Sequence, residues 1–488
     1  MIDIERIKKT ESDRIMEINP ELIRSLVQEV LSQMGPVHGP SAGNVTKSDR
    51  LGVFQTADEA VAAASEAFGV FKKRPMSDRK TATELIRSIC KSQAEELARL
   101  ELEETKVGRI DHKIEKLSAI IQIVQGVEDI KPDVESGDLG IALTEYAPFG
   151  VIGAITPVTH SLPTLACNGI NMLAAGNSVV FNAHPSGSKI AAEGVRRFNA
   201  AIRKAIGIDN LLTIIDPPTL ESAQALFDHK GVSLLVVTGG PQVARAALAS
   251  KKRAIVAGPG NPPVVVDATA DLDRAADGIV KGASYDNNLL CIGEKQVFAV
   301  AEIFDKLMDA MSRHNGFRLS HQQVQSLTTV AFPVGSDGKP HLNKDLIGKD
   351  PAVLAAAAGF SIPTGTQLLY GETDENHPFV QTEQMMPFVP FIRVSNVDRA
   401  IALAKSSEHG FGHTAILHSR DTDVMTKMGK IMECTIFVIN GPSTDGLGLG
   451  GAGQASFSIA GPTGEGITVP RTFSRRRRTT VVGAMRFI

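Results

Sequence analysis

The stretch from Tyr146 to Ala257 repeats one pattern four times, and this pattern limits the fold more than any other feature of the sequence. Each repeat is a short, continuously apolar segment followed by a segment with helical periodicity, as in "FGVIGAITP" followed by "LPTLACNGINMLAAG". Strands that are apolar along their whole length lie in sheets covered on both faces, and helical connections make such strands parallel. The sequence therefore predicts an α/β fold, in which ligands bind in the loops after the strands.

A second region of the same type follows the first. Apolar segments separated by helical patterns occur again from "AIVAG" and "PPVVVDAT" to "CTIFVING". A chain of 488 residues is too long for one hydrophobic core, so we expect separate domains. The tail "TFSRRRRTTVVGAMRFI" predicts a β arm with no partner strand beside it in the sequence. The run Arg475–Arg478 within it favours a salt-bridged edge strand over a phosphate site.

Composition excludes several classes of protein. The formal net charge of -3 gives no electrostatic basis for binding nucleic acid. The four cysteines are widely spaced and form no C-x-x-C pair, which argues against a disulfide framework or a structural metal site and suits a reducing cytoplasm. No apolar run approaches the ~20 residues of a membrane span, and the N-terminus lacks the layout of a secretion signal. We expect a soluble intracellular protein.

The N-terminal segment differs from the rest of the chain. Residues Asn19–Gly35 carry apolar side chains at the spacing of an amphipathic helix, and a linker rich in Gly, Pro and Ser follows. A short helix on a flexible tether cannot bury its apolar stripe alone. It must therefore dock either on its own domain or on a partner, and its sequence leaves both alternatives open.

Three short motifs are candidates for chemistry. Cys291 lies in the turn-like run "SYDNNLLCIGEKQVF", but a lone cysteine is more often a buried core residue than a nucleophile. In "VTGGPQVARAAL" two glycines stand at a strand end before a helix, where a phosphate can bind or the chain can simply turn. The loop "VFNAHPSGS" has the same layout. None of the three identifies a reaction by itself.

Together, and in this order along the chain, these motifs resemble the aldehyde dehydrogenase superfamily from about Asp49 onward. The run "GVIGAITPVTHSLPTLACNGINMLAAGNSVVFNAHPS" is similar to its first cofactor-domain strands, and "VVTGGPQVAR" to its phosphate-facing loop. "NNLLCIGEKQVF" resembles the segment of its nucleophilic cysteine, and "TEQMMPFVP" its motif for the cofactor ribose. The resemblance implies an aldehyde dehydrogenase-like fold, with a Rossmann-type cofactor domain, an α/β catalytic domain and a small β oligomerisation arm.

The resemblance also implies domain boundaries. We expect an N-terminal helix and linker at 1–47, a cofactor-binding domain at 48–250 with 128–146 contributing to the arm, a catalytic domain at 251–445, a return to the cofactor domain at 446–468, and the oligomerisation arm at 469–488.

The same resemblance implies roles for single residues. Cys291 would be the nucleophile, and Thr159 would donate to the oxyanion together with the Cys291 backbone N–H. Glu383 would bind the nicotinamide-side ribose, and Gly239 and Gly240 would face the pyrophosphate. The remaining expected cofactor-binding residues are Thr156, Pro157, Asn182, His184 and Pro185. NAD is favoured over NADP because Asn182 replaces a lysine common elsewhere in the superfamily at that loop. No metal site is expected.

One departure from the family pattern narrows the reaction. Hydrolytic members carry a glutamate that activates water, whereas here Ala257 or Gly258 occupies its place and no carboxylate occurs between Lys251 and Val266. Without a positioned base, water is a poor attacker on a thioester. The chain therefore resembles the CoA-acylating branch, and its "TPVTHS" and "NAHPS" segments resemble acetaldehyde and propionaldehyde dehydrogenases of bacterial microcompartments. In those enzymes a similar N-terminal helix is an encapsulation tag.

The implied function is CoA-dependent oxidation of a short-chain aldehyde, acetaldehyde or propionaldehyde, to acyl-CoA with reduction of NAD, through a thioester on Cys291. Alternatives are a hydrolytic aldehyde dehydrogenase, a cysteine acyltransferase without redox chemistry, and a non-catalytic microcompartment-associated protein of the same fold. We expect a homo-oligomer, dimer or tetramer, inside a microcompartment of the bacterial cytoplasm, with a shell or core protein as partner of residues 19–35.

Overall fold

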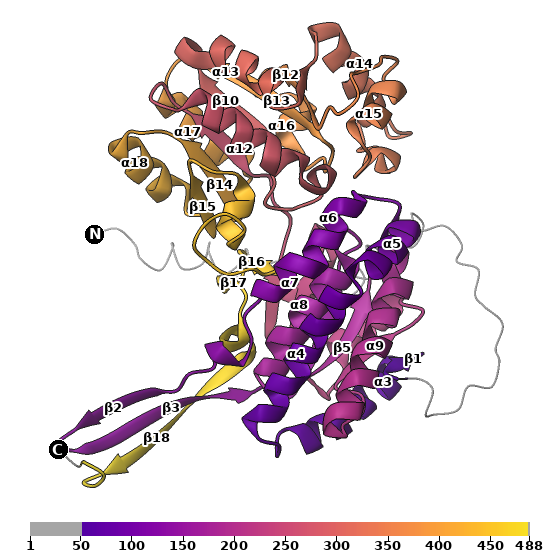
Figure 1. The fold of residues 1–488 in the computed structure, drawn as a ribbon, viewed down its shortest axis with the longest axis vertical. Helices are drawn as coiled ribbons and strands as arrows, with labels where there is room; N and C mark the ends of the chain where they lie inside the picture. Colours follow the sequence, from indigo (N-terminus) through magenta and orange to yellow (C-terminus); the bar gives the residue numbers. More distant parts are fainter. Residues whose placement is uncertain (1–50, 487–488) are drawn as a thin grey trace, which may run out of the picture.

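The computed structural model describes residues 51–486. Two α/β domains lie one above the other in Figure 1, and a three-stranded arm extends from the lower domain. The predicted helix at Asn19–Gly35 and its linker lie outside the described residues. Within 51–486, no helix is both long enough and apolar enough to cross a membrane.

The first domain contains a parallel sheet of six strands within the described residues, in the order β1-β6-β5-β4-β7-β8. From β4 the chain builds outward through β5 and β6, and then it returns to the other side of β4 with β7 and β8. The crevice between β4 and β7 is therefore the switch point at which such sheets bind ligands. The strands are β1 (Val53–Phe54), β4 (Val151–Thr156), β5 (Ser178–Ala183), β6 (Leu212–Ile215), β7 (Val232–Thr238) and β8 (Ala254–Ala257).

Helices cover both faces of this sheet, which confirms the predicted parallel α/β arrangement. Alternate strand residues explain the two faces: Ile152 and Ala154 of β4 pack under α4, α8 and α9, whereas Val151 and Ile155 pack under α3, α10 and α11. Every residue of α8 is buried, because α4 lies over it. The helices are α3 (Ala57–Phe71), α4 (Met76–Ser92), α5 (Ala94–Thr105), α6 (Ile110–Glu115), α7 (Ile121–Ile123), α8 (Ser161–Ala174), α9 (Ser188–Ile206), α10 (Leu220–Asp228) and α11 (Pro241–Leu248), with π-helical η3 (Lys116–Ile120) and 3-10 η4 (Val127–Asp129) and η5 (Pro185–Gly187).

The second domain contains a parallel sheet of seven strands within the described residues, in the order β11-β12-β13-β10-β9-β14-β15. Its strands are β9 (Pro263–Val266), β10 (Gln296–Val300), β11 (Gly316–Arg318), β12 (Leu368–Glu372), β13 (Phe388–Val394), β14 (Thr414–His418) and β15 (Ile436–Ile439). Its helices are α12 (Leu272–Ser284), α13 (Ala301–Arg313), α14 (His321–Ala331), α15 (Pro351–Ala357), α16 (Pro378–Gln381), α17 (Val397–Ser407) and α18 (Thr422–Met432), with 3-10 η6 (Tyr285–Asn288) and η7 (Lys344–Leu346).

The strand β8 belongs to the first domain, although it follows the boundary that we expected at residue 250. The segment "AIVA", which we assigned to the second region, is β8 and pairs with β7 in the first sheet. A short buried apolar segment is compatible with either sheet, because its sequence does not specify its neighbour. The crossing to the second domain is the turn at 258–262, which links β8 to β9.

The glycine-rich stretch after β15 is largely irregular, as its composition predicts. It contains the 3-10 turn η8 (Ser443–Leu447) and the two-residue strands β16 (Ile459–Ala460) and β17 (Gly466–Ile467). Its later part lies against the first domain. The Ser458 hydroxyl is 2.6 Å from the Thr238 hydroxyl at the end of β7 and donates to Asn168 Oδ1 of α8 at 3.0 Å.

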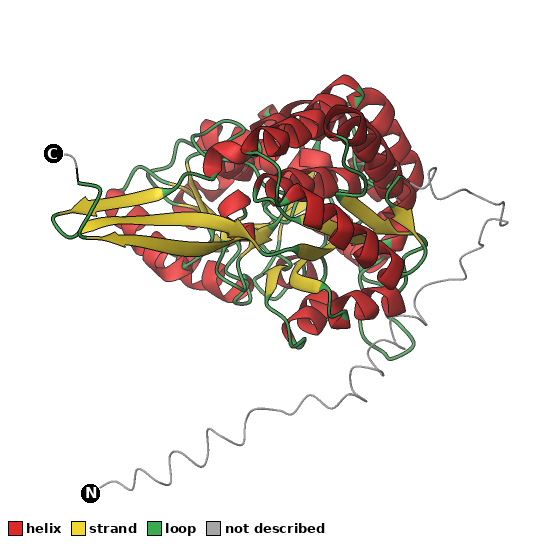
Figure 2. Cartoon of the chain, turned by 90° about the horizontal axis from the view of Figure 1, so that it is seen from below, coloured by secondary structure: helices red, strands yellow, loops and turns green. Residues whose placement is uncertain are grey.

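The arm is an antiparallel sheet in the order β18-β3-β2 that projects from the two domains (Figure 2). It consists of β2 (Asp133–Gly137), β3 (Gly140–Pro148) and β18 (Ser474–Val482), which the 3-10 turn η9 (Pro470–Phe473) precedes. The C-terminal strand therefore pairs with a strand far earlier in the chain. Arg475–Arg478 lie on the exposed edge strand, and Arg478 forms an ion pair with Glu135, as the edge-strand interpretation predicts.

Candidate active site

Cys291 lies in a loop between the two domains that leads directly into β10, as its sequence context predicts. Three consecutive residues of η6 have left-handed backbone conformations: Asp286 (φ 49°), Asn287 (φ 56°) and Asn288 (φ 63°). Asn and Asp tolerate this region better than other non-glycine residues, which explains the run "DNN". The turn presents Cys291 in a partly exposed position, whereas Cys90 and Cys167 are buried in the core.

Gly260 brings together two predicted site residues, Cys291 and Glu383, and a third residue, His413, that was not predicted from the sequence. A Cβ atom at this position would lie 2.4 Å from the Cys291 carbonyl oxygen and 3.1 Å from His413 Cγ, so only glycine fits. The Gly260 N–H donates to Glu383 Oε1 at 3.4 Å. The turn at 258–262 therefore packs between Cys291, Glu383 and His413.

A buried lysine binds the loop that leads to Cys291. Lys295 Nζ donates to the Asn288 carbonyl oxygen at 2.8 Å, to the Leu290 carbonyl oxygen at 3.2 Å and to Asn288 Oδ1. Burial lowers the pKa of Lys295 to about 8, against the opposing charges of Glu383 and Cys291. Burial and the Glu383 charge raise the pKa of Cys291 to about 12, while the charge of Lys295 lowers it.

His413 is a neutral imidazole in this site. Burial lowers its pKa to about 4, and the charge of Lys295 acts in the same direction. Its Nδ1 lies 2.8 Å from the Thr414 hydroxyl, and its Nε2 has no hydrogen-bond partner among the described residues. The ring can therefore take part in a proton transfer.

The predicted cofactor residues of the first domain follow the carboxyl ends of β5, β4 and β7. These strands are parallel neighbours, so their ends lie side by side. The His184 N–H donates to the Thr156 carbonyl oxygen at 3.0 Å, and Pro157 and Pro185 follow in the same two loops. The Gly239 N–H donates to the Ala257 carbonyl oxygen at 3.2 Å. Asn182 is anchored, since its Oδ1 accepts from the Ser222 hydroxyl at 2.6 Å.

The β7–α11 turn has room for a phosphate. Gly240 is the N-cap of α11, no side chain caps this helix end, and no heavy atom lies within 4 Å of a Cβ built on Gly240. No side chain therefore caps the N–H groups of the first helical turn, and such uncapped groups at a helix N-terminus can bind an anion.

Comparisons with known proteins identify the family of this chain. Residues 28–322 match the model of the aldehyde dehydrogenase family. The chain belongs to the aldehyde dehydrogenase family. This aldehyde dehydrogenase is 44% identical to the acetylating acetaldehyde dehydrogenase EutE of Salmonella typhimurium, over 96% of this chain and 100% of the relative. The predicted aldehyde dehydrogenase-like fold is confirmed.

Two solved structures are also similar to this aldehyde dehydrogenase. One is a propionaldehyde dehydrogenase of Rhodopseudomonas palustris with bound CoA and an acylated cysteine, with TM-score 0.85 and 43% identity over 88% of this chain and 98% of that one. The other is a propionaldehyde dehydrogenase from the fucose utilisation microcompartment of Clostridium phytofermentans, with TM-score 0.87 and 40% identity over 90% of this chain and 100% of that one.

A buried polar cluster beside the site of this aldehyde dehydrogenase was not predicted from its sequence. Thr159, the predicted oxyanion donor, is half-buried in the β4–α8 loop, and the next residue, His160, is buried. His160 Nδ1 lies 2.8 Å from Lys116 Nζ, and Lys116 forms an ion pair with Asp286 of η6. The cluster joins the cofactor domain to the loop of Cys291. His160, in the "TPVTHS" segment, and Asp286, in the "DNN" turn, lie in motifs that the sequence analysis singled out, whereas no motif there includes Lys116.

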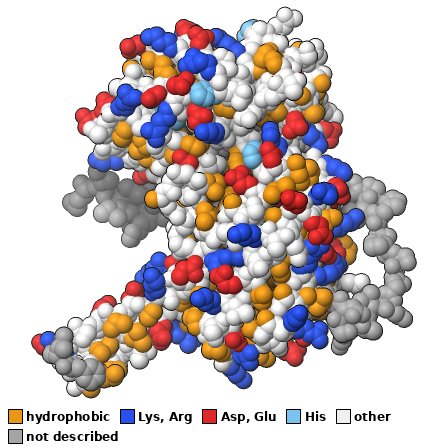
Figure 3. All heavy atoms as spheres, in the orientation of Figure 1, with side chains coloured by type: hydrophobic (Ala, Val, Ile, Leu, Met, Phe, Trp, Pro, Cys, Tyr) orange, Lys and Arg blue, Asp and Glu red, His pale blue; other side chains and the backbone are white. Residues whose placement is uncertain are grey.

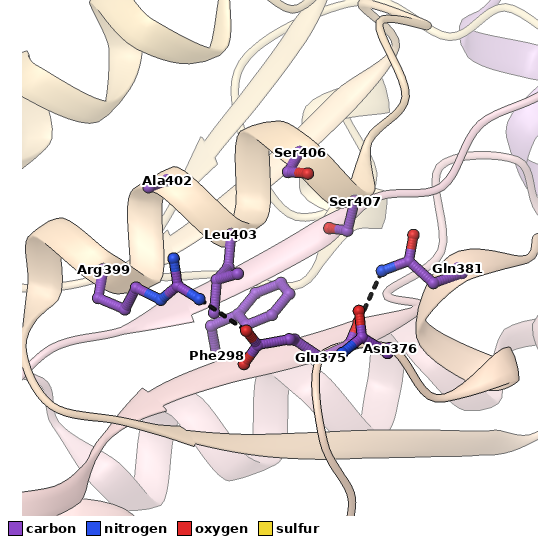
Figure 4. A pocket seen from close by; sticks show the side chains of 9 residues that line it. All are labelled: Phe298, Glu375, Asn376, Gln381, Arg399, Ala402, Leu403, Ser406 and Ser407. Carbon is purple, nitrogen blue, oxygen red and sulfur yellow. Dashed lines mark hydrogen bonds and ion pairs between the residues drawn. The ribbon is translucent and has the colours of Figure 1, made fainter.

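A separate cavity of the enzyme lies in the catalytic domain between α16, α17 and β10 (Figure 4). The Glu375–Arg399 ion pair, 2.6 Å long, stands at one side, and Gln381 donates to the Glu375 carbonyl oxygen. Its wall includes Phe298 and Ser407 but neither Cys291 nor Glu383. This cavity is therefore separate from the site described above.

Proposed function

We propose that the enzyme oxidises a short-chain aldehyde, acetaldehyde or propionaldehyde, to acyl-CoA with reduction of NAD, through a thioester on Cys291. The observation that carries this proposal is the turn at 258–262, which packs against the nucleophile loop and contains no carboxylate. No side chain of this turn can act as a base for a water molecule, which favours a thiol as the group that takes the acyl group from the thioester. The similarity along most of this chain to an acetaldehyde dehydrogenase and to a propionaldehyde dehydrogenase supports the substrate class.

The first half-reaction forms the thioester. The Cys291 thiolate attacks the aldehyde carbon and makes a C–S bond, and the Cys291 backbone N–H and Thr159 stabilise the oxyanion. Bound NAD supplies the hydride acceptor for this carbon. As the oxyanion collapses to a carbonyl, the hydride leaves with its electron pair, and the acyl group remains on sulfur.

The second half-reaction returns the free enzyme. The sulfur of CoA attacks the thioester carbon, the bond to Cys291 breaks, and the thiolate leaves with the electron pair. The CoA thiol loses its proton in this step. His413 is our candidate to accept that proton, because its neutral ring lies against Gly260 with Nε2 free. Both large ligands would have to reach the sulfur of Cys291 from the cofactor side, so we expect ping-pong kinetics.

The residues that follow the carboxyl ends of β4, β5 and β7 fit a dinucleotide. Gly239 and Gly240 would hold the pyrophosphate at the uncapped start of α11, with Thr156 and Pro157 beside it. Asn182, His184 and Pro185 would contact the adenosine half. Glu383 would bind the nicotinamide-side ribose next to Cys291, to which its charge is coupled.

The test is steady-state kinetics of the unmodified enzyme with C2 to C4 aldehydes, NAD or NADP, and CoA present or absent. We expect sustained NADH formation only with CoA. Full turnover without CoA would favour the hydrolytic alternative, and no acyl-enzyme by mass spectrometry would favour a non-catalytic protein. No absorbance change at the nicotinamide band would favour a cysteine acyltransferase.

The first mutational prediction concerns the nucleophile. Cys291→Ala removes the sulfur that carries the acyl group, so we expect NADH formation to fall by a factor of roughly 10⁴ or more. The matched control is Cys434→Ala, which removes the other partly exposed cysteine. Turnover retained by Cys291→Ala would contradict the assignment.

We also propose that residues 1–47 direct the enzyme into a bacterial microcompartment of the cytoplasm. The amphipathic pattern at Asn19–Gly35 supports this, as does the likeness to an enzyme from a fucose utilisation microcompartment. Deletion of residues 1–47 should abolish co-purification with shells in a host that makes them. Unchanged co-purification would contradict the packaging role.

A further inference from the structure

The left-handed turn that leads to Cys291 is held at its first such residue by both the backbone and the side chain. Asp286 has φ 49°, a conformation that is unfavourable for a residue other than glycine. Its carboxylate accepts from the Arg109 N–H at 2.7 Å and forms an ion pair with Lys116. Its backbone N–H donates to His112 Nδ1 at 2.9 Å. All three partners belong to the first domain, and they fix the start of a segment that reaches Cys291 five residues later.

The hydrogen bond to His112 requires an imidazole ring without a proton on Nδ1. A neutral ring has one N–H and one acceptor nitrogen, whereas a protonated ring has two N–H groups and no acceptor. Because the Asp286 N–H donates to Nδ1, the neutral ring carries its proton on Nε2. The Tyr285 ring stacks on the His112 ring, with centroids 4.2 Å apart and planes at 20°, and restricts its rotation. A proton on Nδ1 would therefore point at the Asp286 N–H.

His112 can take up this proton near neutral pH. Four charged groups act on its ring, from α6, from the residue before α6, and from the neighbouring segments η3 and η6: Asp111, Arg109, Lys116 and Asp286. Burial lowers the pKa of His112 from its ordinary 6.5, the two carboxylates oppose this shift, and the two cations support it. Glu101 of α5, which also packs against α6, pairs with Lys113 instead. The ring is half-buried, so it is neutral at pH 7 and becomes protonated as the pH falls below 6.5.

The other contacts of Asp286 keep their strength in the same pH range. Burial raises the pKa of Asp286, but the charges of Lys116 and Lys113 outweigh it and hold this pKa below its ordinary 3.8. The carboxylate therefore stays ionised in mild acid. The Arg109 N–H is a backbone donor and does not titrate. The His112 ring is thus the partner of Asp286 that a proton removes just below neutral pH.

We infer that His112 is a positioning residue for the nucleophile: its neutral ring holds the Asp286 N–H and thereby the turn that presents Cys291, and protonation of the ring releases this turn. The inference rests on Cys291 as the nucleophile of the proposed function. Asp286 is buried, so its N–H loses its acceptor when His112 is protonated, and a buried donor without an acceptor is unfavourable. The enzyme should therefore lose activity in mild acid for a reason separate from the ionisation of the thiol.

The experiment separates the acceptor from the stacked ring. Asparagine places an amide oxygen near the position of Nδ1, so His112→Asn keeps an acceptor that mild acid does not remove. Phenylalanine keeps a ring on Tyr285 but has no acceptor. The kcat/KM for the aldehyde is measured from about pH 4.5 to pH 8.5 for the unmodified enzyme, His112→Asn and His112→Phe. Ratios at each pH cancel the ionisation of Cys291, because all three enzymes share it.

We expect the ratio of the unmodified enzyme to His112→Asn to be constant above pH 6.5 and to fall at lower pH. The fall should be about tenfold once His112 is protonated, which is the effect of one lost hydrogen bond. His112→Phe lacks the bond at every pH and should be about tenfold less active than the unmodified enzyme at pH 8. The control His341→Asn removes an exposed histidine that pairs with Asp337 in the catalytic domain, and it should follow the unmodified enzyme at every pH.

Calorimetry provides a measurement that needs no turnover. The unfolded chain binds the His112 proton near pH 6.5 and the folded protein binds it only at lower pH, so the stabilisation by His112 is present above pH 6.5 and is lost in acid. The Tm of the unmodified enzyme, relative to His112→Asn, should therefore fall below pH 6.5.

A ratio or a Tm difference for His112→Asn that does not change with pH would overturn the inference. Full activity of His112→Phe at pH 8 would also overturn it, because the acceptor would then be dispensable. If His112→Phe does not fold, His112→Asn decides the question. Failure of the proposed function gives a different result, namely turnover by Cys291→Ala.

Discussion

Glu294 places a carboxylate in the interior of the nucleophile loop, three residues after Cys291. It is fully buried, and it accepts two hydrogen bonds from Ser443. Burial raises the pKa of Glu294 to about 7, from an ordinary value of 4.5. Between these two pH values the folded protein keeps a proton that the unfolded chain has lost. The contribution of Glu294 to stability is therefore fully present below pH 4.5 and is lost as the pH rises through 7.

Replacement of Glu294 by glutamine should remove this pH dependence. The pKa displacement corresponds to about 3 kcal/mol at ~1.36 kcal/mol per pH unit. A chain of this length has an unfolding entropy of about 1 kcal/mol/K, so the effect is about 3 °C in Tm. We expect the Tm of the unmodified enzyme, relative to Glu294→Gln, to fall by about this amount from pH 5 to pH 8. Differential scanning calorimetry measures it, and parallel Tm curves would contradict the prediction.

At the scale of elements, η6 is held in place by the other domain. The Asp286 carboxylate forms an ion pair with Lys116 of η3 and accepts from the Arg109 N–H at 2.7 Å. The Asp286 N–H donates to His112 Nδ1 at 2.9 Å. The charges of Lys116 and Lys113 lower the pKa of Asp286, although burial alone would raise it. The left-handed turn that presents Cys291 therefore depends on side chains of the cofactor domain.

Asp286→Asn should destabilise the protein more than the loss of an ion pair on the surface does. It leaves the Lys116 ammonium buried and unpaired, which costs about 3–5 kcal/mol. We expect a drop in Tm of about 3–5 °C together with lower kcat. Asp111→Asn is the control, because Asp111 also pairs with Arg109, at 2.9 Å, but is exposed. An exposed pair contributes less than ~1 kcal/mol. Equal Tm changes in the two variants, by calorimetry, would refute the argument.

The elements also show which parts of the site a sequence can predict. Continuous apolar segments followed by glycine or proline predicted the positions of β4, β5 and β7. The loops of Thr156, His184 and Gly239 follow from these positions. The cluster of Lys116, His160 and Asp286 joins distant parts of the chain, and no local pattern records such contacts. The same holds for β8, whose apolar segment does not specify a neighbouring strand.

At the scale of the whole molecule, the arm is the part least supported by the core. Apolar side chains gather on it (Figure 3), and Val134, Leu139 and Val482 are 60%, 84% and 79% exposed. Exposed apolar side chains that occur together on a projecting element mark an interaction site. We therefore infer that subunits associate through their arms.

Charged residues on the arm should then dissociate the oligomer. Leu139→Asp with Val482→Asp would place two carboxylates in an apolar contact, where desolvation is costly. We expect light scattering after size-exclusion chromatography to give a mass near the 51.9 kDa of one chain, against a multiple of it for the unmodified enzyme. Val334→Asp is the control, because Val334 is 72% exposed but lies in the catalytic domain away from the arm. An unchanged mass in the double variant would mean that another surface holds the subunits together.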